Sequence, residues 1–217
     1  MSCAICQTRK EKRFCPAVHG RICSQCCGEQ REVSLDCPSE CVYLRQAREH
    51  ERPRQSNEVD QNALFPKIEI SDQFLYEQEQ LIVGISYSLA RSARAAQALR
   101  DADVIAALTA LTKTYETLAV SGLHYEIAIT NLSQQAIVSE IQKMIKEYRE
   151  AEHKHLGFTR LRDSDVLRAL VFLLRMALTR TSGRPRSRAF VDFLLAQFPE
   201  QEHAIATADE GSRIIVP

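Results

Sequence analysis

The chain of 217 residues carries 28 Lys and Arg against 28 Asp and Glu, so no net charge draws it toward nucleic acid or anionic lipid. Hydrophobic residues make up 45% and charged residues 26%, which is close to globular averages and excludes wholesale disorder. The length allows one large domain, or an ordinary domain with a small appendage.

All eight cysteines lie between Cys3 and Cys41, and the rest of the chain has none. The start, MSCAICQTRK, has no apolar signal-peptide core, so we expect a soluble, cytoplasmic protein. Reducing cytosol disfavours disulfides, and closely paired cysteines there are typical of metal ligands or redox centres. Residues 1–50 are therefore predicted to be a small zinc-binding module.

The donors of this module fall into four pairs: Cys3 with Cys6, Cys15 with His19, Cys23 with Cys26, and Cys37 with Cys41. Zinc takes four soft or borderline donors in a tetrahedron, so four pairs make two sites. Adjacent pairing would require separately folded knuckles, and the first three pairs are too close together for that. Interleaving is the alternative, because each ion then closes a loop that contains half of the other site.

The stretch FCPAVHGRICSQC (14–26) resembles the middle of a HIT or MYND finger, and the order of the donors is similar to the RING consensus. The likeness covers residues 1–45 and implies a cross-braced finger with two Zn²⁺ ions in interleaved sites. The implied ligands are Cys3, Cys6, Cys23 and Cys26 for one ion, and Cys15, His19, Cys37 and Cys41 for the other.

Cys27 is left over beside Cys26. It is the true ligand in place of Cys26, a buried small hydrophobe, or a redox-reactive thiol. The motif CPSEC (37–41) predicts a helix start with Pro38 at the first helical position, so that the helix VYLRQAREHE leaves the site.

The remainder of the chain predicts a mainly α fold, in which the module is followed by an all-helical bundle. Residues 51–71 are predicted to be a linker or an extended helix end, with a short extended segment in LFPKIEIS. Apolar residues then recur at helical spacing, which predicts a bundle over 72–200 and a tail over 201–217. Three of its helices are expected at Ser71 to Leu99, Ser133 to His153 and Ser187 to Phe198.

Two similar stretches, RDADVIAAL (100–108) and RDSDVLRAL (162–170), predict two further helices. Asp101 and Asp163 are expected to accept first-turn amides, and the next aspartate of each stretch suits the positive helix end. The second of these helices is apolar nearly all round, which predicts the central helix of the bundle. Because Arg168 and Arg175 interrupt it, we expect no membrane span.

Arginine is concentrated between Arg160 and Asp192, where eight arginines and no lysine occur. The segment RTSGRPRSR (180–188) resembles the core of an AT-hook, a minor-groove reader. The other interpretation is a helix-to-helix turn with a solvated basic rim. The metallated module is itself close to neutral, because two zinc ions and seven thiolates cancel the surplus of Lys and Arg over residues 1–54.

No phosphate loop, nucleophile elbow or catalytic triad is visible in the sequence. The leading hypothesis is therefore a zinc-binding adaptor that binds a protein partner and is not an enzyme. One alternative is a nucleic-acid-associated regulator that uses the arginine-rich turn. The other is a redox sensor, since thiolate ligands remain oxidisable.

Overall fold

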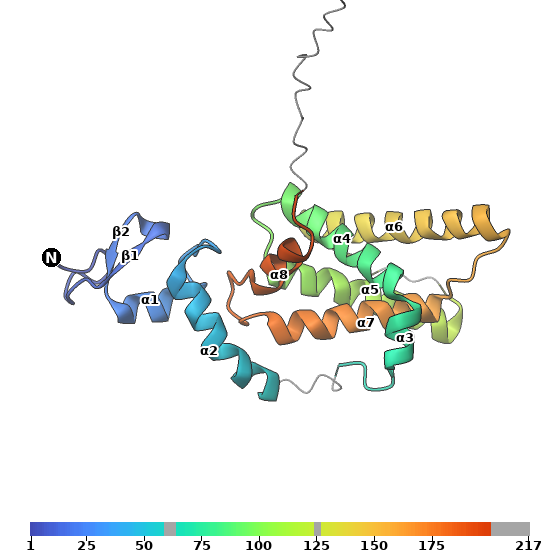
Figure 1. Ribbon diagram of the computed structural model, residues 1–217, viewed down its shortest axis with the longest axis horizontal. Coiled ribbons are helices and arrows are strands. Elements are labelled where there is room, and N and C mark those ends of the chain that lie inside the picture. Colours follow the sequence, from blue (N-terminus) through green and yellow to red (C-terminus); the bar gives the residue numbers. More distant parts are fainter. Residues whose placement is uncertain (59–63, 124–126, 201–217) are drawn as a thin grey trace, which may run out of the picture.

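The computed structural model describes residues 1–58, 64–123 and 127–200, so the predicted tail lies outside the described residues. A small N-terminal module leads into a bundle of helices (Figure 1). The predicted mainly α fold, with a small module ahead of a helical bundle, is confirmed. No helix in the described ranges has both the length and the apolar character needed to cross a membrane.

The module is built on a short antiparallel hairpin followed by one helix. Its elements are β1 (Arg13–Cys15), the 3-10 turn η1 (Pro16–Val18), β2 (Gly20–Ile22) and α1 (Ser24–Gln30). Side chains alternate along a strand, so Cys15 and Ile22 face inward while Phe14 faces solvent. Two buried cysteines of α1, Cys26 and Cys27, pack against this inner face.

Helix α2 (Val42–Glu58) carries the chain out of the module and into the segment predicted to be a linker. The predicted helix start at Pro38 is wrong, because α2 begins at Val42. Residues 37–41 instead form a turn in which the amide of Cys41 donates to the carbonyl of Pro38 at 3.0 Å. This turn keeps both cysteines of the motif ahead of the helix.

Six helices form the body: α3 (Asp72–Glu77), α4 (Glu79–Ala95), α5 (Asp101–Ser121), α6 (Leu132–Leu156), α7 (Asp163–Arg180) and α8 (Ala189–Gln197). The helix predicted from Ser71 to Leu99 is divided at Gln78 into α3 and α4. Ser71 caps α3, since its hydroxyl accepts the amide of Phe74 at 3.2 Å. The break lets Phe74 join the same core as the buried face of α4. The other two predicted helices are present as α6 and α8.

Helix α7, predicted to be the central helix, is buried along most of its length (Figure 1). It packs against α4, α5 and α8 of the body and against α2. Arg175, one of the charges in its apolar run, donates to the carbonyls of Leu64, Phe65 and Ile68 and so holds the entrance of the bundle. The buried residues of α7 are Val166, Leu167, Ala169, Leu170, Val171, Leu173, Leu174 and Ala177.

The two similar helix starts use their aspartates differently from the prediction. Asp103 in α5 and Asp165 in α7 accept the backbone amide just ahead of their helices. Asp163 forms an ion pair with Arg149 at 2.6 Å. The expectation that Asp101 and Asp163 cap their own helices is therefore wrong. Asp101 instead accepts amides of α8, and Asp163 pairs with Arg149.

Asp101 has a role outside its own helix. Its carboxylate is fully buried and accepts the amides of Phe190 and Val191 in the first turn of α8. It also accepts the hydroxyl of Ser187 at 2.7 Å. A carboxylate at the positive end of a helix is favourable, so Asp101 joins the start of α5 to the start of α8.

We expect Asp101→Ala to lower the free energy of unfolding by about 3 kcal/mol, since it leaves buried amide donors without an acceptor. Asp163→Ala is the matched control, at the same position of the similar stretch. It should cost less than about 1 kcal/mol, because the ion pair with Arg149 is partly exposed. Urea denaturation measures both values, and equal losses would contradict the assigned role.

Candidate metal centre

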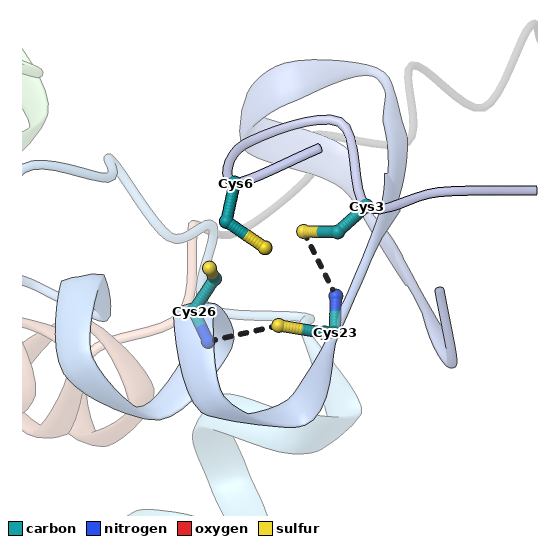
Figure 2. A group of neighbouring side chains, drawn as sticks. All are labelled: Cys3, Cys6, Cys23 and Cys26. Atoms are coloured by element: carbon teal, nitrogen blue, oxygen red, sulfur yellow. Dashed lines mark hydrogen bonds between the residues drawn. The ribbon is translucent and has the colours of Figure 1, made fainter. Parts of the chain in front are cut away.

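Four cysteines meet between the N-terminal loop and the start of α1. The sulfurs of Cys3, Cys6, Cys23 and Cys26 all lie within 4.8 Å of one another and point toward a common centre (Figure 2). Cys3, Cys23 and Cys26 are buried, and Cys6 is half-buried. The first and third pairs of the sequence therefore come together across the intervening hairpin, as interleaving requires. We call these four residues the cysteine tetrad.

Local backbone structure places each pair of the tetrad. In the first loop, Gln7 adopts a left-handed φ of 55° and its amide donates to the carbonyl of Cys3 at 2.9 Å. This tight turn brings Cys3 and Cys6 to the same side. At the second pair, Cys23 precedes α1, and its sulfur accepts the amide of Cys26 at 3.4 Å (Figure 2). The amide of Cys23 in turn donates to the sulfur of Cys3 at 3.2 Å.

The surroundings divide the thiols of the tetrad by their pKa. A hydrogen bond from the Thr8 side chain, with backbone amides beside it, lowers the pKa of Cys6 to about 5. Burial raises the pKa of Cys26 to about 12, and hydrogen bonds with the neighbouring cysteines add to the rise. Arg9 lies 3.7 Å from the sulfur of Cys23, and this contact raises the pKa of Arg9. The tetrad thus combines ionised and protonated sulfurs beside a cation.

The tetrad is suited to hold one metal ion. Four thiolates at this separation can form a tetrahedron, the geometry that soft divalent ions take with sulfur. In the part of the chain that the structure describes, no other group of potential ligands is drawn together as closely.

The second predicted set, Cys15, His19, Cys37 and Cys41, is not gathered in this way. Cys15 is buried at the end of β1, and Cys37 and Cys41 are half-buried in the turn ahead of α2. Burial raises the pKa of the Cys37 thiol, and the nearby thiols of Cys15 and Cys41 raise it further. His19 is exposed at the tip of the hairpin with a left-handed φ of 47°. Its role as a ligand stays a prediction.

Cys27, left over in the sequence, is buried in α1 and accepts a hydrogen bond from Arg13 at 3.6 Å. Cys26 belongs to the tetrad, so the structure gives no support to Cys27 as its replacement. Adjacent residues of a helix point about 100° apart. Two consecutive cysteines in a helix are therefore not expected to bind the same ion, and this could have been read from the sequence.

No protein-family model, no curated protein and no solved structure matches this chain. No family match therefore supports the resemblance of residues 1–45 to MYND, HIT and RING fingers. The finding that stands is the cysteine tetrad at metal-binding distance.

A buried ionic group fastens the module to the body. Glu32, 2% exposed, accepts from Arg48 of α2 at 2.6 Å and from the hydroxyl of Ser182 at 2.8 Å. Arg48 also donates to Asp192 of α8 at 2.8 Å. Burial alone would lower the pKa of Arg48, but these two carboxylates outweigh it and raise that pKa. We call Glu32, Arg48, Ser182 and Asp192 the docking cluster.

The arginine-rich turn contacts the module as well. Arg184 donates to the carbonyls of Gly28 and Arg31, at and just beyond the carbonyl end of α1, where a cation is favoured. Arg186 forms an ion pair with Asp36 at 2.8 Å. Its backbone amide donates to the carbonyl of Glu32 in the docking cluster. The turn that resembles an AT-hook is thus in contact with the N-terminal module.

We expect zinc affinity to fall on acidification. The raised pKa of Cys26 keeps that thiol protonated at neutral pH, so a metal must displace its proton. Cys6, with its pKa of about 5, is already ionised there and adds no pH dependence above about 6. Apparent affinity should weaken by at least about tenfold per pH unit from 8 to 6. Competition with a chromophoric chelator measures this, and a flat profile would contradict it.

Removing one partner of the docking cluster should be costly. We expect Glu32→Ala to lower the free energy of unfolding of the zinc-loaded protein by about 3 to 5 kcal/mol, because Arg48 is left partly buried with one carboxylate. Lys143→Ala, which breaks an exposed pair with Glu147, is the control and should cost less than about 1 kcal/mol. The double variant with Arg48→Ala should cost less than the two single changes added together. Strict additivity would count against the cluster.

Proposed function

We propose that this chain is a zinc-binding adaptor that binds a protein partner through its metal-organised module and has no catalytic activity. The cysteine tetrad is the observation that carries this proposal. Zinc is the metal that four thiolates in a tetrahedron favour, with iron–sulfur chemistry as the other use of such ligands. The reducing cytoplasm is the proposed location, since all eight cysteines are free thiols in the structure.

The chemistry of the tetrad supports a structural role for the metal. A catalytic zinc keeps one coordination position for water or substrate, whereas four cysteine ligands fill the tetrahedron. Three of the four ligands are also buried, which restricts the approach of a substrate. The ion would hold the N-terminal loop to α1.

A second ion belongs to this proposal, because the module has little other core. Its buried apolar residues besides cysteine are Ile22, Leu35 and Leu44. Structural zinc contributes about 10 to 16 kcal/mol in small fingers, against an ordering cost of about 1 to 2 kcal/mol per residue. Cys15, Cys37 and Cys41 supply three further donors around a single cavity, and they need a fourth.

The surface of the hairpin supports a protein partner. Phe14 is 56% exposed on β1, and Val18 is exposed beside it at the hairpin turn. Aromatic side chains are frequent anchors of protein interfaces. The nucleic-acid alternative has less support, because Arg184 and Arg186 already contact carbonyls and a carboxylate of the same chain.

The test is metal-dependent binding of an identified partner. A partner captured with the full-length chain would be purified and its Kd measured against zinc-loaded, chelated and zinc-restored protein. We expect binding to be lost on chelation and regained with zinc. Phe14→Ser should weaken it at least about tenfold, while Val120→Ser, an 84% exposed residue of α5, should leave it unchanged. Full affinity in the chelated protein would refute the proposal.

A further inference from the structure

We propose that Cys15, Cys27, Cys37 and Cys41 form a second four-thiolate metal site, in which Cys27 takes the place that the sequence assigns to His19. This inference extends the proposed zinc function, because it names the missing fourth donor. It also makes α1 the element shared by both sites.

A small cavity carries the inference. Cys15, Cys27, Cys37 and Cys41 all line one cavity of about 10 Å³, and His19 is not among its lining residues. That volume is close to the space of a single water molecule, so the cavity suits one ion and nothing larger. The rest of the lining is largely apolar, with Ala17, Leu35, Pro38 and Leu44 among it. Sulfur is therefore the main ligand chemistry that this space offers.

Helix geometry explains how two neighbouring cysteines serve two sites. Cys26 and Cys27 are consecutive residues of α1, so their side chains leave the helix about 100° apart. Cys26 turns toward the tetrad, while Cys27 turns to the cavity with Cys15. Both side chains are buried.

Each group of sulfurs also has its own arginine. Arg9 donates to the sulfurs of Cys23 and Cys26 in the tetrad. Arg13 donates to the sulfur of Cys27 at 3.6 Å and lies over the ring of Tyr43 at 4.5 Å. Four thiolates around a divalent ion carry two net negative charges, which a nearby guanidinium stabilises. The second group thus repeats the electrostatic arrangement of the first.

The position of His19 points the same way. Its side chain is exposed and its backbone closes the hairpin turn, where its amide donates to the carbonyl of Pro16. The strand pairing of Cys15 with Gly20 fixes this turn. A histidine held there is directed to solvent, whereas Cys27 is already at the cavity.

The second group lines a cavity but is not drawn together as a potential metal-binding group in the way that the tetrad is. Zinc–sulfur bonds of about 2.3 Å place tetrahedral sulfurs about 3.8 Å apart. Binding of an ion would draw the turn over 37–41 toward α1 and close the cavity.

The test uses the full-length chain without any partner. Native mass spectrometry should count two zinc ions in the unaltered protein and in His19→Ala, and one in Cys27→Ser. After exchange with cadmium-113, NMR of the unaltered chain should give two signals, both in the four-thiolate range. His19→Ala should leave both signals in place. The NMR experiment on the unaltered chain holds even if Cys27→Ser fails to fold.

Three results would overturn the inference. They are a signal in the range of three thiolates and one imidazole, loss of an ion in His19→Ala, and a single bound ion in the unaltered protein. Each leaves the tetrad site and the partner-binding part of the adaptor proposal standing, because the tetrad signal and partner binding are measured separately. A single bound ion would remove only the second ion from that proposal. Conversely, two four-thiolate signals in a protein that binds its partner after chelation would support the site and refute the adaptor.

Discussion

The close packing of four cysteine sulfurs is the constraint on which the N-terminal module depends. Sulfurs within 4.8 Å of one another repel when ionised and gain little when protonated, unless a cation joins them. The module has little apolar core that could stabilise it in place of a metal. Its buried cluster consists largely of cysteine, with Ile22 and Leu35. A hairpin of two three-residue strands does not hold a fold by itself. Ligation supplies the free energy that such a module lacks.

The consequences of this constraint reach the body through α1 and the residues that follow it. Helix α1 contributes Cys26 to the tetrad, and its carbonyl end meets Arg184 of the turn ahead of α8. Glu32, just beyond the helix, is the buried centre of the docking cluster. A change in the position of α1 would therefore displace an acceptor and a buried carboxylate together. The module and the bundle are linked by groups that are costly to leave unpaired.

Sequence patterns predicted what depends on periodicity and on donor spacing. They identified the central apolar helix α7 and the grouping of Cys3 and Cys6 with Cys23 and Cys26. They did not predict contacts between distant segments: Asp101 appeared to be a cap for its own helix, and it caps α8. The turn over 37–41 was mistaken for a helix start because proline suits both. Cys27 had no obvious partner, since only the fold brings it beside Cys15, Cys37 and Cys41.

The charge of the module gives a reason for the arginine-rich turn. If the proposed two zinc ions are bound by seven thiolates, residues 1–54 are formally neutral, and an eighth thiolate at Cys27 would make them negative. Asp36 and Glu51 add local negative charge on the side that meets Arg184 and Arg186. Arginine suits this surface, because one planar guanidinium can bind a backbone carbonyl and a carboxylate together. The same basic segment that suggests nucleic-acid binding in the sequence thus contacts carbonyls and carboxylates of the module and joins it to the helical body.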